Sequence, residues 1–332
     1  MRAVFKICFE GIVYPCERSE TVLHALRRQG VEVPFSCQHG ICQTCMLRSL
    51  QGKAPAAARK EIKDTLCEQG YFLACQCVPE EDMVVLLPRE ADLYGRAVVL
   101  EKHFLTPHIC RLVLKSATPL YYHAGQFVNL HRDDGLARSY SLASVPHRDK
   151  HLELHVKRMK NGLMSNWIYS ELKPGDAIDL EGPNGNCYYL PGREVQSLLL
   201  IGTGTGLAPL VGIARDALYS GHGGEIHLYH GSHSRDGLYL MDTLRDLAKE
   251  FSNFHYMPCV SGERGEEGIR AGRADDTAFS DFPNLAGWRV FLCGSPPMVA
   301  SAKRKAYLQG ARLADIYADP FEVSDRRLKP RD

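Results

Sequence analysis

The stretch that constrains the fold most strongly is Cys37-Gln-His-Gly-Ile-Cys42-Gln-Thr-Cys45, and Cys75 follows on a later segment. Four cysteines in the pattern C-x4-C-x2-C…C have the spacing of one class of [2Fe–2S] site. A short loop then surrounds one iron, and a distant segment supplies the last thiolate. A small residue such as Gly40 lets backbone N–H groups approach the bridging sulfides. The predicted cluster ligands are Cys37, Cys42, Cys45 and Cys75.

A structural zinc site with four cysteine ligands is the alternative, because such sites also use C-x2-C pairs. Zinc sites usually combine two such pairs, and Cys75-Gln-Cys77 is not one, so the spacing favours iron and sulfur. Residues 1 to about 88 resemble a plant-type ferredoxin domain, including the Leu-Ala-Cys-Gln-Cys ending. The resemblance implies an α+β, ferredoxin-like β-grasp domain over residues 1–90.

The whole chain has 332 residues, which is too long for one such domain and fits two or three. Its 45% hydrophobic residues, 24% charged residues and net charge of +1 indicate a globular protein and do not point to nucleic acid or a membrane surface. No apolar run reaches the length of a membrane span. Twelve cysteines spread over the chain suit a reducing compartment, so we expect a cytoplasmic protein.

The first 90 residues read as a mixture of short strands and helices, with a domain boundary at Pro88-Arg-Glu-Ala-Asp. The expected elements are strands on either side of Glu10-Gly11, a helix over 20–29 with Ser19 as its cap, a helix over 54–70 and a strand over 83–88.

Residues 91–195 read as a second domain, an antiparallel β-barrel, because short strands recur at regular spacing between Gly, Pro and Asp residues. One helix interrupts these strands. The expected elements are strands over 97–101, 110–114, 126–130, 139–143 and 151–157, and a helix over 163–172.

Two segments of this barrel fit a flavin nucleotide. Arg138-Ser-Tyr140-Ser141 ends one strand, and Gly162-Leu-Met-Ser165 opens the helix. An aromatic ring can lie against an isoalloxazine, an arginine can neutralise a pyrophosphate, and the N–H groups at a helix N-terminus can bind the same phosphates. Ser141 is placed to hydrogen-bond the reactive edge of the flavin.

These segments resemble the Arg-x-Tyr-Ser/Thr and Gly-x-x-Ser signatures of the FAD domain of the ferredoxin-NADP reductase superfamily. The resemblance implies FAD, while the sequence leaves FMN open. The residues assigned to the flavin are Arg138, Tyr140, Ser141, Val156, Lys157, Gly162, Met164 and Ser165.

Residues 196–332 alternate apolar strands with helical segments, which predicts an α/β domain with a parallel, doubly wound sheet. The expected strands are 197–201, 225–229, 255–260, 289–293 and 316–317, and the expected helices are 207–219, 238–250, 270–280 and 297–309.

The first turn of this domain, Gly202-Thr-Gly-Thr-Gly-Leu-Ala-Pro209, follows an apolar strand and opens a helix. Glycines let the backbone approach a dinucleotide phosphate, and the helix N-terminus supplies donors. Pro209 and the lack of an acidic residue ending the second strand depart from the Rossmann fingerprint. The same superfamily uses Gly-x-Gly-x-x-Pro here and Cys-Gly-x-Pro-x-Met later, which Cys293-Gly-Ser-Pro-Pro-Met298 matches.

This resemblance implies a nicotinamide site and places Cys293 near the carbon from which hydride leaves. The residues assigned to the nucleotide are Gly202, Thr203, Gly204, Thr205, Gly206, Cys293 and Gly294. Ser234 and Arg235 suit the 2′-phosphate of NADPH, whereas Asp236 opposes it, and we expect NADH. Phe321 resembles the terminal aromatic that stacks near the flavin in this family, although eleven residues follow it.

Two sets of histidines do not read as metal sites. One set alternates faces on a strand and the loop after it, and consists of His227, His230 and His233. The second set is no more tightly spaced along the sequence. The other set is His147, His151 and His155.

The order of the three domains resembles the reductase components of bacterial ring-hydroxylating dioxygenases and multicomponent monooxygenases. That resemblance implies that electrons pass from NADH to FAD and then to the [2Fe–2S] cluster. The final acceptor is then an oxygenase or hydroxylase component, or another one-electron acceptor protein. We expect this acceptor to dock near the Cys37–Cys45 loop. Two alternatives stay open at this point. One is a reductase for a different acceptor, such as a deoxysugar dehydratase or a ferric chelate. The other is a non-catalytic redox-sensing or zinc-binding module.

Overall fold

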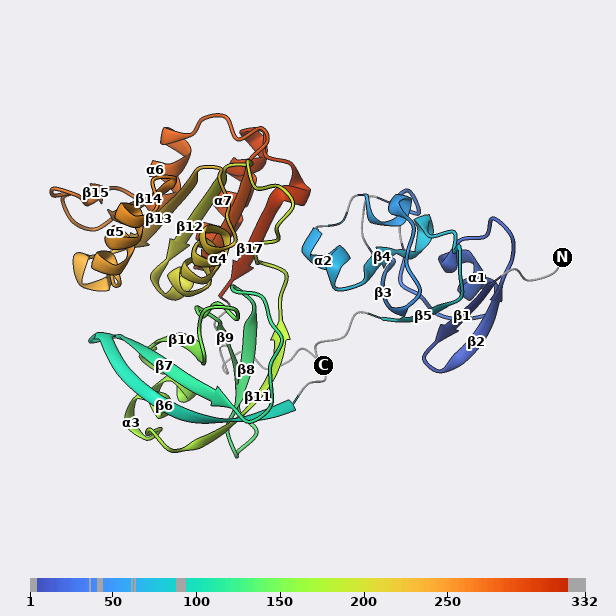
Figure 1. Ribbon diagram of the computed structural model, residues 1–332, viewed down its shortest axis with the longest axis horizontal. Helices are drawn as coiled ribbons and strands as arrows, with labels where there is room; N and C mark the ends of the chain where they lie inside the picture. The colour runs from blue at the N-terminus through green and yellow to red at the C-terminus, as the bar shows by residue number, and fades with distance from the viewer. Residues whose placement is uncertain are drawn as a thin grey trace. The chain divides into compact units, whose positions relative to one another are not determined.

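The computed structural model describes residues 5–35, 37–40, 44–60, 62, 64–87 and 94–321. The chain divides into two compact units, residues 1–90 and 91–332 (Figure 1). The second unit contains two sheets of different construction, one antiparallel and one parallel. The fold is therefore that of three successive domains, as the sequence predicts.

The first unit is a five-stranded mixed sheet in the order β2-β1-β5-β3-β4. Strands β1 and β5, from the two ends of the unit, pair in parallel, and the other pairs are antiparallel. This is the β-grasp arrangement. Its elements are β1 (Phe5–Phe9), β2 (Ile12–Cys16), α1 (Val22–Arg28), β3 (Met46–Gln51), η1 (Ala56–Arg59), α2 (Asp64–Glu68), β4 (Tyr71–Leu73), η2 (Ala74–Gln76) and β5 (Met83–Leu86).

Helix α1 begins later than the sequence suggests, and its cap is a different residue. Thr21 is the N-cap, and its side chain accepts a hydrogen bond from the backbone N–H of His24 across 3.3 Å. Ser19 has a positive φ of 66°, which is outside the extended geometry of an N-cap, so the prediction of Ser19 as the cap was wrong. A helix of the predicted type does form over nearly the predicted residues.

The short helix predicted within residues 54–70 is present, but in two separate pieces. The segment forms two short helices, η1 and α2, because Pro55 precedes the first and the alanine-rich stretch lacks a continuous apolar stripe. Gly70 then turns the chain into β4 with a φ of 87°.

The first part of the second unit is a six-stranded antiparallel sheet in the order β10-β7-β6-β11-β8-β9. A bridge between Leu142, which follows β9, and Leu154, which lies within β10, links the two outer strands, so the sheet closes into a barrel. Its elements are β6 (Tyr94–Thr106), β7 (Ile109–Ser116), β8 (Phe127–His131), β9 (Ala137–Ser141), β10 (Leu152–Lys157), α3 (Leu163–Ser170) and β11 (Ala177–Asn184).

The second part is a six-stranded parallel sheet in the order β15-β14-β13-β12-β16-β17, flanked by helices (Figure 1). Its strands are β12 (Leu198–Thr203), β13 (Ile226–Ser232), β14 (Phe254–Val260), β15 (Arg270–Ala271), β16 (Arg289–Gly294) and β17 (Ile316–Pro320). Its helices are η3 (Gly204–Gly206), α4 (Leu207–Tyr219), η4 (Arg235–Gly237), α5 (Met241–Glu250), α6 (Ala274–Asp281), α7 (Pro296–Leu308) and η5 (Leu313–Asp315).

Two hydrophobic cores lie on opposite faces of this sheet. Helices α4 and α5 contribute to one core, and α6 and α7 contribute to the other. The strands are buried on both faces, which explains why β12 and β16 read as continuous apolar runs. The carboxyl ends of the strands are left to form the site, as in other doubly wound sheets.

Among the described residues, no helix combines the length and the apolar character needed to cross a bilayer.

Candidate functional site

Three of the four predicted cluster cysteines lie among the described residues, and Cys42 lies outside them. Cys45 and Cys75 are buried, and Cys37 is partly exposed. The backbone N–H of His39 points to Cys37 Sγ across 3.3 Å, and the Gln76 amide lies 3.6 Å from Cys75 Sγ.

N–H donors directed at sulfur are what thiolate ligands of an iron–sulfur cluster require. A Cβ on Gly40 would lie 3.0 Å from the Gln76 side chain, and its φ is 79°. The loop thus has a place that only glycine fills without strain. These residues fit a [2Fe–2S] cluster.

The flavin segments lie at one end of the barrel. Arg138, Tyr140 and Ser141 belong to β9, and Ser141 is buried while Tyr140 is partly buried. Burial raises the pKa of the Tyr140 phenol, so its hydroxyl stays protonated. A neutral, partly covered ring of this kind fits an isoalloxazine face.

Helix α3 follows Gly162, which is its N-cap and makes no side-chain capping bond. A Cβ at Gly162 would lie 2.4 Å from Ser165 Oγ, so only glycine fits. The Ser165 hydroxyl accepts from the backbone N–H of Met159 across 3.1 Å and fixes the turn into the helix. The helix N-terminus is thereby available for an anion such as a pyrophosphate. Met164 is buried in the barrel core.

Val156 and Lys157 end strand β10. Val156 is buried, and the backbone carbonyl of Val156 lies 3.4 Å from the Tyr169 hydroxyl. Lys157 is exposed, and its Nζ lies 3.8 Å from the Cβ position of Gly204. A cation from the barrel therefore lies beside the glycine-rich turn of the parallel sheet.

The glycine-rich turn runs from the end of β12 through η3 into α4. Pro209 falls in the first turn of α4, where a backbone N–H has no partner within the helix. This explains the departure from the Rossmann fingerprint, because proline at that position costs no helical hydrogen bond. Thr203 Oγ1 accepts from the backbone N–H of Ser295 across 3.2 Å and ties the turn to the start of α7.

Close backbone approach explains two glycines of the site. A Cβ at Gly206 would lie 2.3 Å from the carbonyl oxygen of Cys293, and one at Gly294 would lie 2.7 Å from the Thr203 carbonyl oxygen. Gly294 also has a φ of 121°. The two loops of the predicted nucleotide site are therefore in direct backbone contact.

Cys293 is fully buried at the end of β16. Burial raises the pKa of its thiol well above the ordinary value. Its Sγ lies 3.7 Å from the Sγ of Cys187, a residue that no sequence motif singles out.

Asp319 is the functional candidate that the sequence reasoning missed. Gly202, Cys293 and Asp319 are successive register partners across β12, β16 and β17. Asp319 Oδ2 accepts a hydrogen bond from Ser141 Oγ across 3.2 Å. Burial raises the pKa of the Asp319 carboxyl to about 6, and the Ser141 hydrogen bond lowers it in part.

Three family models match the chain in the order of its domains. They are a 2Fe-2S iron-sulfur cluster binding domain over residues 5–80, an oxidoreductase FAD-binding domain over 97–189 and an oxidoreductase NAD-binding domain over 200–304. The reductase subunit of an aromatic O-demethylase from Amycolatopsis sp. is 37% identical over 89% of this chain and 92% of its own length. The reductase component of a phenol 2-monooxygenase from Pseudomonas sp. is 33% identical over 94% of this chain and 92% of its own length.

The chain belongs to the family of iron–sulfur flavoprotein reductases. The crystal structure of the Amycolatopsis cytochrome P450 reductase GcoB is similar to this reductase with 34% identity and a TM-score of 0.68, over 96% of this chain and 99% of that one. A ferredoxin reductase of a carbazole 1,9a-dioxygenase has the same fold, with 22% identity and a TM-score of 0.63.

The reductase therefore is an NAD(P)H-dependent oxidoreductase with FAD and a [2Fe–2S] cluster. The match to the iron–sulfur domain decides against the zinc alternative, and the match to the FAD-binding domain decides against FMN. Membership of this family of reductases also decides against a non-catalytic redox-sensing or zinc-binding module.

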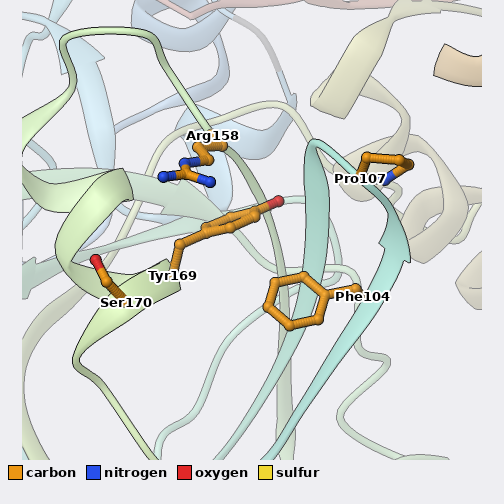
Figure 2. A pocket seen from close by; sticks show the side chains of 5 residues that line it. All are labelled: Phe104, Pro107, Arg158, Tyr169 and Ser170. Atoms are coloured by element: carbon orange, nitrogen blue, oxygen red, sulfur yellow. The ribbon is translucent and has the colours of Figure 1, made fainter.

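A pocket of about 330 Å³ lies on the barrel of the reductase, beside the C-terminal half of α3. Figure 2 shows the Tyr169 ring between the Arg158 side chain and the Phe104 ring. The ring centroids of Phe104 and Tyr169 are 5.2 Å apart, and the Arg158 guanidinium lies 5.5 Å from the Tyr169 centroid. Pro107 and Ser170 complete the lining.

The loop after β13 contains Ser234, Arg235 and Asp236, which the sequence predicts to bear on the choice between NADH and NADPH. Arg235 forms an ion pair with Glu266, and its backbone N–H donates to Glu263 Oε2 across 3.0 Å. Both glutamates lie between β14 and β15, far from Arg235 in the chain, so no local sequence pattern connects them with Arg235. Two carboxylates thus lie beside the cation that would bind a 2′-phosphate.

Proposed function

We propose that the reductase takes hydride from NADH at the junction of the barrel and the parallel sheet, and passes single electrons through its cluster to an oxygenase or hydroxylase component. This proposal rests on one arrangement of residues. Three neighbouring strands align Gly202, Cys293 and Asp319, and Ser141 of the barrel donates a hydrogen bond to Asp319. It brings residues of the flavin segment and of the nucleotide segment together in one place. FAD, when bound, accepts two electrons at once and releases them singly, as a cluster requires.

At the flavin, Tyr140 covers the ring, Ser141 bonds its reactive edge, and Arg138 neutralises the pyrophosphate in this proposal. The amides that begin α3, at Gly162, Met164 and Ser165, bind the same phosphates. Val156 and Lys157 flank the nucleotide from β10. Phe321, whose backbone N–H donates to the Gly294 carbonyl across 2.7 Å, lies near the flavin.

The test is flavin retention. Arg138→Ala removes a cation from the phosphates and should purify with FAD in substoichiometric amount, measured from the ratio of flavin absorbance to protein. Arg96→Ala is a matched control, because Arg96 is an exposed arginine on β6 of the same barrel. Full FAD occupancy of Arg138→Ala would contradict the role.

At the nicotinamide nucleotide, the backbone of Gly202, Thr203, Gly204, Thr205 and Gly206 contacts the phosphates, since α4 begins there and offers its N–H groups. Cys293 and Gly294 line the place for the nicotinamide ring. The ring must lie against the flavin for hydride transfer, which is the geometry that such residues enforce.

NADH is the proposed donor. Glu263 and Glu266 engage Arg235 and add negative charge where NADPH carries its 2′-phosphate. Asp236, next in the chain, has the same sign. Like charges at this position oppose the phosphate, and the paired Arg235 is less available to offset them.

The double variant Glu263→Gln, Glu266→Gln tests this selectivity. The ratio of kcat/KM for NADPH over NADH should rise by about twofold to fivefold, the size expected of an exposed charge pair. Glu267→Gln, an exposed neighbour in the same loop, should leave the ratio unchanged. An unchanged ratio in the double variant would contradict the proposal.

The acceptor protein is proposed to dock on the first unit near the Cys37–Cys45 loop. Phe35, which precedes this loop, and His39 within it have exposed side chains. The guanidinium carbon of Arg27 lies 3.7 Å from the centroid of the Phe35 ring. Electron transfer requires a short path from cluster to acceptor, so a surface next to the ligands is the suitable one. The relatives named as components of oxygenase systems support an oxygenase as the acceptor.

Docking is tested by Phe35→Ala, with Ile12→Ala as the control. Both residues are exposed hydrophobics of the first unit, but Ile12 begins the edge strand β2, at the opposite side of the sheet from β4 and Cys75. Phe35→Ala should raise the KM for the oxygenase component severalfold and leave NADH-dependent ferricyanide reduction unchanged. Equal effects of the two variants would contradict this docking site.

We further propose domain limits of 1–90, 91–195 and 196–332, and a cytoplasmic location. The twelve cysteines support the location because they suit a reducing compartment.

A further inference from the structure

A cluster of two histidines and a glutamate lies at the amino ends of β13 and β14. Glu225 comes immediately before β13, His227 is the second residue of β13, and His255 is the second residue of β14. His227 and His255 are register partners in this parallel pair, so their side chains leave the same face of the sheet. Glu225 precedes His227 by two residues and shares that face.

The side chains converge on one point. The two imidazole rings are stacked, with centroids 4.5 Å apart and an interplanar angle of 17°. Glu225 Oε2 lies 2.6 Å from His255 Nε2 and 4.0 Å from His227 Nε2. The potential ligand atoms all lie within 4.8 Å of one another.

The distances of 2.6 Å and 4.0 Å from the Glu225 carboxylate to the two imidazoles lie on either side of the ligand–ligand distance in a metal site. Ligand atoms around a tetrahedral ion with bonds of about 2.0–2.2 Å lie roughly 3.4 Å apart. Glu225 and His255 are 54% and 47% exposed, so small rotations of these two side chains bring the three atoms to that spacing. Imidazole and carboxylate ligands in this number suit zinc and leave one position for water.

The surroundings hold His227 in place. Its ring centroid lies 4.5 Å from that of Phe282 and 5.8 Å from that of Trp288. One ligand is thus fixed and two are free to adjust.

We propose that Glu225, His227 and His255 bind a divalent transition metal ion, with Zn²⁺ as the best fit. The site is at the amino ends of the strands, whereas Gly202 and Cys293 lie at the carboxyl ends of β12 and β16. The ion therefore takes no part in hydride or electron transfer. It joins two neighbouring strands and stabilises the nucleotide domain by an amount that rises with the logarithm of the zinc concentration above Kd.

The test uses tag-free holoprotein, whose cluster cysteines already hold iron, and Zn²⁺ as the probe. Equilibrium dialysis against buffered zinc, followed by mass spectrometric metal analysis, compares wild type with His255→Gln and Glu225→Gln. His103→Gln is the control, because His103 is an exposed histidine 3.5 Å from the Glu101 carboxylate and belongs to no such cluster of three ligands among the described residues.

Wild type and His103→Gln should bind about one zinc ion per chain. The two site variants should bind it at least about tenfold more weakly, since even indirect losses around a metal cost that much. Zinc should also raise the melting temperature of wild type but not of the site variants. Equal zinc binding by wild type and both site variants, or an equal loss in His103→Gln, would overturn the proposal. NADH-dependent ferricyanide reduction checks that each variant is folded.

Discussion

The Ser141 hydroxyl donates a hydrogen bond to Asp319 Oδ2 across 3.2 Å. It joins β9 of the barrel to β17 of the parallel sheet, 178 residues further along the chain. Burial raises the pKa of Asp319 to about 6. The carboxyl group therefore gains its charge just below neutral pH, at the place where flavin and nicotinamide are proposed to meet.

The first prediction concerns the pH dependence of flavin reduction. Hydride departure leaves positive charge on the nicotinamide, which a nearby carboxylate stabilises. Because Asp319 is ionised above its pKa of about 6 and neutral below it, the rate should rise with pH through that region and then level off. Stopped-flow flavin reduction at saturating NADH measures this profile.

Asp319→Asn should give a slower and pH-independent rate, since the amide keeps the shape of the carboxyl and lacks its charge. An inflection near pH 6 that survives in Asp319→Asn would assign the titration to another group.

The second prediction concerns Ser141. Its hydrogen bond lowers the pKa of Asp319, so Ser141→Ala should move the inflection of the wild-type profile to higher pH. The same stopped-flow series gives the answer. An inflection that stays in place, or that moves to lower pH, would show that the two side chains are not bonded in the working enzyme.

The third prediction separates packing from positioning at Cys293. Cys187 and Cys293 are both buried and their sulfurs are 3.7 Å apart, so replacing either by alanine removes a similar volume. Cys293→Ala should slow flavin reduction by about tenfold or more, whereas Cys187→Ala should stay within about twofold of wild type. If both variants slow equally, the thiols serve packing alone.

The fourth prediction concerns the contact between the two nucleotide loops. Gly206→Ala puts a Cβ 2.3 Å from the Cys293 carbonyl oxygen, so the backbone must shift, at a cost of about 1–3 kcal/mol. NADH-dependent flavin reduction should fall sharply and the melting temperature should drop. Gly223→Ala has no heavy atom within 4 Å of its Cβ and should change neither quantity. A fully active Gly206→Ala would contradict the proposed use of this turn.

Much of the fold follows from the sequence because its signals are local. The apolar runs of β12 and β16 and the glycines that follow them mark a parallel sheet with a nucleotide turn, and the helix over 207–219 matches α4 in full. The alternation of short strands likewise indicates the barrel. Where local signals compete, the prediction fails: Thr21 and Ser19 are both good caps, and only the backbone geometry selects Thr21.

The site is less predictable because its partners are distant in the chain. Asp319 lies within the Tyr317–Phe321 segment, where only the aromatic Phe321 matches a family pattern. The pairing of β16 with β17 is what shows that Asp319 neighbours Cys293. His227 is close in sequence to His230 and His233, whereas its register partner His255 lies on the neighbouring strand β14. Such pairs depend on strand order, which composition and spacing do not encode.

The order of electron transfer is the central claim, and one variant tests it most directly. Residues 1–90 and 91–332 are separate compact units, so Cys42→Ser should lose the cluster and leave the flavin unit folded. Under anaerobic conditions, NADH should still bleach the flavin of Cys42→Ser at the wild-type rate, while reduction of the oxygenase component is abolished. Loss of flavin reduction in a folded Cys42→Ser protein with full FAD would contradict the proposed order.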